Sequence, residues 1–324
     1  MNIYPTGVWK HGVNMYWNHH NDRFDEFTGF RYRDILGGPQ VGLTRRDPSP
    51  VIRVGDTYYV WYSRTCHSRS GYTATIWYAT SLDGVNWQEQ GEALGRGGAG
   101  TFDEHAVFTP SILVAGGRYY LSYTGVPEPF YHDGPQITKT AIGMAVADSP
   151  DGPWVRVSSE PILTPSDDLE AFDSLRVDDT CFVCREGKYW MYYKGRGWNR
   201  TARETKMGLA IATEPEGPYV KHPRNPVLDS GHEVCVWPHG KGVAALVSDV
   251  GPQGNTLQYA DDGVHFRKVC DIVPPKAPGP FRADHFIDGA GPGISWGISM
   301  VDNRENWPYL VRFDCNLLAT SEKG

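Results

Sequence analysis

Acidic residues precede strand-like segments at several places in this chain, where they could do acid–base chemistry together. These residues are Asp47, Asp103, Asp179 and Glu233, and each comes before a segment of strand-forming residues. Neighbouring carboxylates raise one another's pKa, so one carboxyl group can keep its proton near neutral pH while another stays ionised. Such a set can activate water and protonate a leaving oxygen, as cleavage of a glycosidic bond requires.

The segments that follow these acids repeat along the chain. A turn and then alternating aromatic residues occur at 55–62, 116–123 and 187–193, with a weaker copy at 240–247. After each copy comes an apolar strand with an Asp-Gly or Glu-Gly turn, at 83–84, 151–152, 216–217 and 262–263. Asp-Gly pairs form hairpin turns at low steric cost, and aromatic residues suit a pleated, half-buried surface. Both features indicate an all-β chain.

The length of the repeat predicts the architecture. A period of roughly 60 residues with four short strands is typical of one propeller blade, and the chain is long enough for about five. We therefore predict a five-bladed β-propeller over residues 41–324, with a sandwich of similar strands as the alternative. The fifth blade would combine strands at 294–298 and 309–313 with an early strand, which leaves no exposed sheet edge. Residues 1–40 are expected to form an extension that packs on the propeller or on a partner subunit.

Propeller geometry predicts where the site lies. Because the inner strand of each blade lines the central channel, polar residues that open the inner strands converge in one funnel. We expect Asp47, Asp179 and Glu233 to meet there as catalytic carboxylates. The residues expected to contact the substrate are Arg46, Trp77, Asp103, His105, Thr109, Asp178 and Trp237. Trp and Tyr side chains suit stacking on sugar faces, although most of them are expected in the core.

Composition limits the partners and the compartment. The net charge is −7 with mixed signs, which argues against a nucleic acid or an anionic membrane as partner. No stretch approaches the roughly 20 apolar residues of a membrane-spanning helix. The N-terminus lacks the pattern of a secretion signal, so we expect a cytoplasmic protein, or a periplasmic or secreted one if a signal was removed. Cys181 and Cys184 lie three apart on one apolar strand, facing opposite ways, and are expected to be buried thiols and not a zinc site.

Several stretches resemble one known family. They are 217–222, 225–227, 230–234 and 237–238, together with 107–110, 251–252 and 255–260. In these stretches the chain resembles glycoside hydrolase family 117, the 3,6-anhydro-α-L-galactosidases that act on neoagaro-oligosaccharides. It is similar more distantly to families 43, 32 and 68. The resemblance implies a propeller enzyme that inverts anomeric configuration and cleaves from the non-reducing end of an oligosaccharide.

The resemblance also implies roles for single residues. Asp47 matches the general base, Asp179 matches the acid that orients or tunes its partner, and Glu233 matches the acid of the fourth blade. His232 is an alternative proton donor. No cofactor is expected to be required, and metal ligands are not assigned, although related propellers hold a divalent cation in the channel. A homodimer is one expected assembly.

The chain departs from the family pattern near the site. The third-blade motif usually reads V-H-D-P but is V-D-D-T at 177–180, so a carboxylate replaces a histidine. His105 stands where an arginine is expected, the loop 64–72 is shorter, and the N-terminal helical swap segment is not recognisable in residues 1–40. The alternatives are an exo-acting furanosidase (an α-L-arabinofuranosidase or a fructan-type enzyme), a phosphorylase and a non-catalytic sugar-binding propeller. The last would lack at least one carboxylate, and all three are present.

Overall fold

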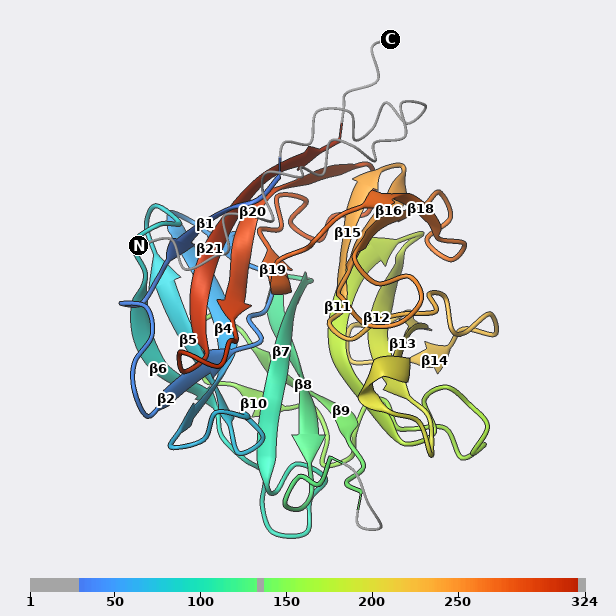
Figure 1. Ribbon diagram of the computed structural model, residues 1–324, viewed down its shortest axis with the longest axis horizontal. Coiled ribbons are helices and arrows are strands. Elements are labelled where there is room, and N and C mark those ends of the chain that lie inside the picture. The colour runs from blue at the N-terminus through green and yellow to red at the C-terminus, as the bar shows by residue number, and fades with distance from the viewer. Residues whose placement is uncertain (1–28, 133–136, 320–324) are drawn as a thin grey trace.

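The chain folds as a five-bladed β-propeller in a computed structural model that describes residues 29–132 and 137–319. Figure 1 shows the strands of the blades lengthwise. The inner strands of the blades are β2 (Leu43–Arg46) with β3 (Ile52–Val54) in blade I, β7 (Ala106–Ala115) in blade II, β11 (Arg176–Arg185) in blade III, β15 (Cys235–Gly240) in blade IV and β19 (Lys276–Pro280) in blade V. The predicted architecture is confirmed.

Antiparallel strands continue outward from each inner strand. In blades I to III they are β4 (Thr57–Cys66), β5 (Thr75–Ser81) and β6 (Gln88–Leu94), then β8 (Arg118–Val126), β9 (Ala141–Ala147) and β10 (Val155–Arg156), then β12 (Lys188–Arg196), β13 (Lys206–Ala212) and β14 (Val220–Lys221). In blades IV and V they are β16 (Gly242–Val247), β17 (Thr256–Ala260) and β18 (Arg267–Asp271), then β20 (Gly291–Val301) and β21 (Tyr309–Leu318). The repeated segments predicted from the sequence form the second strands of blades I to IV. Each second strand has a neighbouring strand on both sides.

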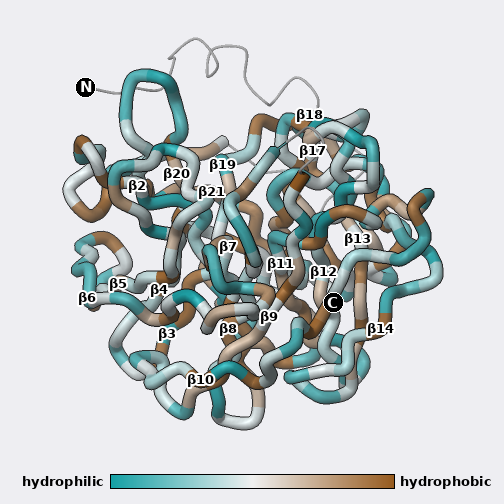
Figure 2. Tube along the Cα trace, turned by 90° about the horizontal axis from the view of Figure 1, so that it is seen from below, coloured by the Kyte–Doolittle hydropathy of each residue, from teal (hydrophilic) through white to brown (hydrophobic). Residues whose placement is uncertain are grey.

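Figure 2, turned by 90° from the view of Figure 1, places β7, β11 and β19 toward the centre and β6, β10, β14 and β18 toward the rim. Blades IV and V share one continuous sheet, because β15 pairs with β20.

An early strand completes blade V. β1 (Arg31–Asp34) pairs antiparallel with β21, with Tyr32 opposite Phe313. Phe30 packs edge-on against Phe313, with 5.9 Å between the ring centroids. The propeller therefore begins before the expected boundary at residue 41, because this strand covers the outer edge of the last blade. The rest of the expected extension, residues 1–28, lies outside the described part of the chain.

Aromatic side chains fill the space between blades. Trp61 of β4, Tyr123 of β8 and Tyr193 of β12 are buried. Trp61 meets Trp154 of the next blade edge-on, with 5.6 Å between the ring centroids. In Figure 2, apolar stretches lie in the interior near β11 and β12, while peripheral loops are largely hydrophilic. Among the residues described, no helix is long and apolar enough to cross a membrane.

Arg282 crosses between the inner strands. Its side chain is fully buried, and its Nη1 donates a hydrogen bond to Phe182 O of blade III at 2.6 Å. Its backbone N–H donates to Val51 O of blade I at 2.9 Å. Asp284 accepts bonds from Nε and Nη2, each at 2.7 Å, and so compensates the buried charge. Arg282 thus links the connection after β19 to blade I through its backbone and to blade III through its guanidinium group.

Candidate active site

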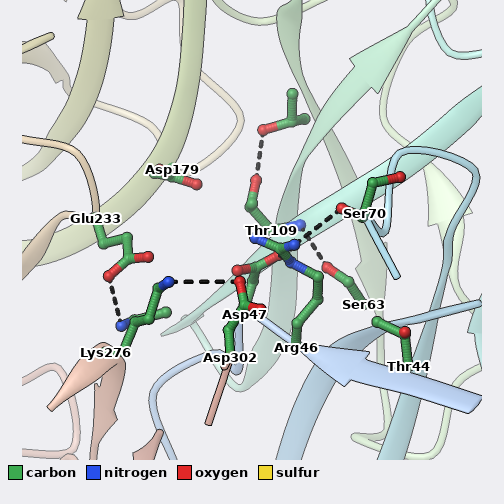
Figure 3. Close-up of polar contacts among 12 residues, drawn as sticks. Thr44, Arg46, Asp47, Ser63, Ser70, Thr109, Asp179, Glu233, Lys276 and Asp302 are labelled. Carbon is green, nitrogen blue, oxygen red and sulfur yellow. Dashed lines mark hydrogen bonds and ion pairs between the residues drawn. The ribbon is translucent and has the colours of Figure 1, made fainter. Parts of the chain in front are cut away.

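The three predicted catalytic acids line one pocket. Asp47 comes from blade I, Asp179 from β11 of blade III, and Glu233 from the segment that enters β15 of blade IV. Figure 3 shows their carboxylates around a common space. The same pocket is lined by four further residues predicted from the sequence, Arg46, Thr109, Asp178 and His232. The propeller therefore brings together acids that are far apart in the sequence.

A repeated backbone irregularity presents these side chains to the pocket. Asp47, Thr109 and Asp179 have positive φ angles of 50°, 47° and 45°, and Ala277 of blade V has 45°. On β7, β11 and β19 the strand register shifts at this point, so the residue there is left out of regular pairing. A non-glycine residue in this conformation costs about 1–3 kcal/mol, and such strain clusters at functional sites. Proline follows three of the four residues, where the interrupted ladder needs no N–H donor.

A buried lysine controls the ionisation of Asp179. Nζ of Lys194, on β12, donates a hydrogen bond to Asp179 Oδ2 at 2.5 Å and lies 3.0 Å from Asp178 Oδ1. The second contact is an ion pair without hydrogen-bond geometry. Burial raises the pKa of Asp179 to about 7, against the opposing effect of Lys194. Burial alone would lower the pKa of Lys194, but the two aspartates raise it well above its ordinary value, so the lysine stays charged.

Burial shifts the pKa values of Glu233 and His232 in opposite directions. It raises the pKa of Glu233, although the N–H of Ala277 donates to Oε2 at 2.7 Å and opposes the rise. Burial, together with the cations Lys194 and Lys276, lowers the pKa of His232 to about 3. Nδ1 of His232 is buried without a hydrogen-bond partner. Near neutral pH, Glu233 is therefore better suited than His232 to carry a transferable proton.

Arg46 fixes the orientation of Asp47. Its Nε donates to Asp47 Oδ2 at 2.8 Å, and its Nη1 donates to Ser70 O at 2.9 Å. The loop that carries Ser70 continues with Gly71, which has a φ of +75° and whose added Cβ would meet Arg46 Cδ at 2.5 Å. A larger residue at that position would displace the guanidinium. The ion pair thus depends on a close approach of the loop that follows β4.

Aromatic side chains form one wall of the pocket, and the sequence analysis did not single them out. Tyr72 stacks on Phe130 with 4.0 Å between ring centroids, and Phe108 meets Tyr72 edge-on at 5.8 Å. His132 lies 5.8 Å from Phe130, centroid to centroid. The guanidinium of Arg176 lies 4.3 Å from the centroid of Phe130. Such a wall suits the apolar face of a sugar ring, but in the sequence its members resemble core aromatics.

Four residues predicted to contact the substrate do not line this pocket. Trp77 donates its Nε1–H to Thr75 Oγ1 at 3.0 Å and stacks on Arg64. Trp237 is only 1% exposed and packs in the core of blade IV. His105 precedes β7, where its backbone N–H donates to Val126 O at 2.8 Å. The structure thus places these residues, and Asp103 with them, outside the pocket that Asp47, Asp179 and Glu233 line.

Asp103 is a structural anchor within blade II. It is 1% exposed, and it accepts hydrogen bonds from Tyr123 Oη at 3.0 Å and Arg156 Nε at 2.7 Å. The equivalent set in blade III is Asp173, Tyr193 and Lys221. The aspartate ties the second strand of its blade to the fourth. Blade II presents Thr109 to the pocket instead, because that residue occupies the irregular position of the inner strand.

Lys194 is the functional residue that the repeats could have revealed. On the second strand of blade III, Lys194 pairs with the residue that comes before the positive-φ position of the inner strand. Ser63 in blade I and Thr124 in blade II occupy the equivalent positions. These hydroxyls bind Thr109: its N–H donates to Ser63 Oγ at 2.8 Å, and its Oγ1 lies 2.5 Å from Thr124 Oγ1. When one copy of a buried repeat carries a charged side chain where the other copies carry a hydroxyl group, the charge indicates a candidate functional site.

The residues described do not favour a metal in the channel. No group of three or more His, Cys, Asp or Glu side chains among them could hold a metal ion. Arg282 already places a positive charge between the inner strands, and Lys194 places another in the pocket. That no cofactor is required, with a divalent cation in the channel as a possibility, stays a prediction.

Known proteins share this fold and part of the sequence. The family model "Glycosyl hydrolases family 43" matches residues 39–197. A family 117 glycoside hydrolase from the marine bacterium Zobellia galactanivorans is 33% identical, with a TM-score of 0.79 over 90% of this chain and 91% of that one. A GH62 α-L-arabinofuranosidase catalytic domain from Coprinopsis cinerea has 10% identity and a TM-score of 0.58, over 90% and 99%. An uncharacterized Mycobacterium tuberculosis protein is 26% identical over 222 residues, which are 65% of this chain but only 64% of that relative.

A five-bladed propeller with three carboxylates in one pocket defines this chain as a member of the propeller glycoside hydrolases. The identity to the Zobellia protein, and the nearly complete coverage of both chains, make the assignment narrower. The chain belongs to glycoside hydrolase family 117. The family resemblance stated from the sequence is therefore confirmed.

Proposed function

We propose that this protein is an exo-acting, inverting glycoside hydrolase that removes 3,6-anhydro-α-L-galactose from the non-reducing end of α-1,3-linked neoagaro-oligosaccharides. The convergence of Asp47, Asp179 and Glu233 in one pocket carries the proposal. Membership of family 117 supports glycosidic bond hydrolysis. The choice of sugar and linkage follows from the resemblance of the sequence stretches described above. An aromatic wall beside the acids supports binding of a terminal sugar ring.

In this proposal Asp47 is the general base and Glu233 is the general acid. Asp47, held by Arg46, takes a proton from the water that attacks the anomeric carbon from the face opposite the leaving oxygen. Glu233 gives its proton to that oxygen, which its raised pKa favours. Each transfer contributes on the order of 10²–10⁴-fold to the rate. The product leaves with inverted configuration.

Asp179 and His232 position the reacting groups. Asp179 accepts a hydrogen bond from Lys194, which favours its charged form against the effect of burial, and it lies beside the space where the terminal sugar binds. His232 is uncharged near neutral pH, and its buried Nδ1 offers a hydrogen bond to a sugar hydroxyl. Both roles hold the sugar between base and acid.

Asp178 supports a second candidate, an exo-acting furanosidase. This carboxylate, paired with Lys194, replaces the neutral histidine of the usual family motif. It therefore changes what the pocket offers to the hydroxyl groups of the terminal sugar. In Coprinopsis cinerea a chain of the same fold is an α-L-arabinofuranosidase, which supports testing that sugar here.

The test is hydrolysis of a substrate panel by the wild type, Asp47→Asn and Glu233→Gln. The panel contains neoagarobiose, neoagarohexaose, an aryl α-L-arabinofuranoside and a fructan. We expect release of anhydro-galactose by the wild type and losses of about 10²–10⁴-fold in both variants. Asp148→Asn is the matched control, because that side chain is 88% exposed on the outside of blade II. If the wild type cleaves only the arabinofuranoside, the enzyme is an arabinofuranosidase and the proposal of anhydro-galactose as substrate is wrong. Near-normal turnover by Asp47→Asn or Glu233→Gln would show that the substituted residue has no role in the mechanism.

A further inference from the structure

A second hollow opens beside the catalytic pocket. It is a groove of about 1110 Å³, lined by residues from 169–173, 197–200 and 203–206, by residues of the connection at 221–229, and by Pro252 of blade IV. The two hollows share Thr205, which lines both. Ala202 faces the catalytic pocket, whereas Arg203 faces the groove. The connection between β12 and β13 is therefore the common wall of both.

Trp198 presents an indole to this groove from a fixed backbone. Its side chain is 38% exposed, and its N–H donates to Ser174 Oγ at 2.8 Å. The preceding Gly197 is closely packed, since an added Cβ would meet the carbonyl oxygen of Ala171 at 3.0 Å. Arg196 Nε donates a hydrogen bond to the carbonyl oxygen of Arg200 at 2.6 Å. A large aromatic surface is thus held open to solvent.

The charges that line the groove are mostly neutralised within it. Arg200 lies 3.4 Å from Glu204, nitrogen to oxygen. Lys206 and Asp229 approach to 2.5 Å, and Lys221 and Asp173 to 2.6 Å. Because these charges are paired with opposite charges, the lining offers many hydrogen-bonding atoms but little net electrostatic potential. This chemistry suits an uncharged, hydroxyl-rich ligand better than an anionic or cationic one.

We propose that this groove binds the leaving-group part of a neutral oligosaccharide, with a sugar ring stacked on Trp198. The inference rests on the proposed function, in which the terminal sugar occupies the catalytic pocket. The rest of the chain must then continue into an adjoining hollow, and the groove shares a wall with that pocket. Stacking of a ring on an indole, with hydroxyl groups facing the ion pairs, gives the enzyme a preference for longer chains.

The test compares Trp198→Ala and Trp198→Phe with the wild type on neoagarobiose and neoagarohexaose. We expect the ratio of kcat/KM for the hexasaccharide to that for the disaccharide to fall about tenfold in Trp198→Ala, which corresponds to about 1.4 kcal/mol and lies within the range of aromatic contacts. Trp198→Phe should recover most of the ratio. Equal melting temperatures exclude an effect of misfolding. An unchanged ratio in a folded Trp198→Ala variant overturns the groove proposal and leaves the proposed function intact.

If the wild type cleaves neither sugar, the proposed function fails and binding alone tests the groove. Isothermal titration of the wild type and Trp198→Ala with neoagarohexaose, arabinohexaose and an inulin-type hexasaccharide then decides. Binding of one of them that weakens about tenfold in Trp198→Ala supports the groove. Binding of none, or equal binding to both proteins, overturns it.

Discussion

Lys194 Nζ lies 2.5 Å from Asp179 Oδ2, and the two residues come from adjacent strands of one blade. Their side chains are only 14% and 12% exposed. The lysine also faces Asp178, so one cation serves two carboxylates at the wall of the catalytic pocket. The ionisation of a candidate catalytic acid therefore depends on a residue of the neighbouring strand.

Replacement of Lys194 tests this dependence. In Lys194→Met, Asp178 and Asp179 lose their cation, so the pKa of Asp179 should rise above its value of about 7. We expect the acidic limb of kcat/KM to move to higher pH and the free energy of unfolding to fall by about 3–5 kcal/mol. Lys194→Arg keeps the charge and should restore the pH profile. A profile in Lys194→Met that matches the wild type would contradict the role given to Lys194.

The stability of the protein should depend on pH through Asp179. Its pKa is raised from 3.8 to about 7 by folding, so the folded state holds this proton more tightly than the unfolded state. The resulting stability is fully present below pH 3.8 and is lost as pH rises to about 7. Urea denaturation across this window should show the wild type losing stability relative to Asp179→Asn. A constant difference between the two proteins across the window is the contrary outcome.

The identity of the proton donor is tested by a pair of variants. Because burial lowers the pKa of His232 to about 3, this imidazole is uncharged at neutral pH and lacks the acidic second proton that a proton donor would transfer. We expect Glu233→Gln to abolish the basic limb of kcat/KM and His232→Ala to raise KM while the limb persists. If His232→Ala is at least as damaging to kcat as Glu233→Gln, and removes the basic limb, the donor is His232.

Stereochemistry tests the arrangement of Asp47 and Glu233. An inverting enzyme needs a separation of roughly 6.5–9.5 Å between its carboxyl groups to fit a water, whereas a retaining enzyme needs about 5–5.5 Å. We expect proton NMR to detect the first released sugar with the anomeric configuration opposite to that in the substrate. A product of unchanged configuration, or a covalent glycosyl-enzyme trapped at Asp47, would assign the retaining mechanism instead.

The repeats determined the fold, because each copy carries the same local information. A turn, an aromatic strand and an Asp-Gly or Glu-Gly turn specify one blade, and the number of copies specifies the propeller. The same reading predicted that Asp47, Asp179 and Glu233 converge at the channel, and all three line one pocket, although Asp179 lies within β11 and Asp47 between β2 and β3. β1 in blade V follows from the need to cover the last sheet edge.

The tertiary structure alone decided which residue of each blade reaches the pocket. In blade II the sequence offers Asp103 and Thr109 within a few residues, and only the register shift of the inner strand selects Thr109. The sequence did not reveal Lys194, because the pairing of β11 with β12 decides which residues it contacts. That pairing can be inferred from the sequence only once the repeats are aligned with one another. The pKa values of Asp179 and His232 depend on burial and on charges from other blades. Local propensity acts over a few residues of one strand, whereas register, burial and electrostatic fields arise only when strands distant in sequence are packed together.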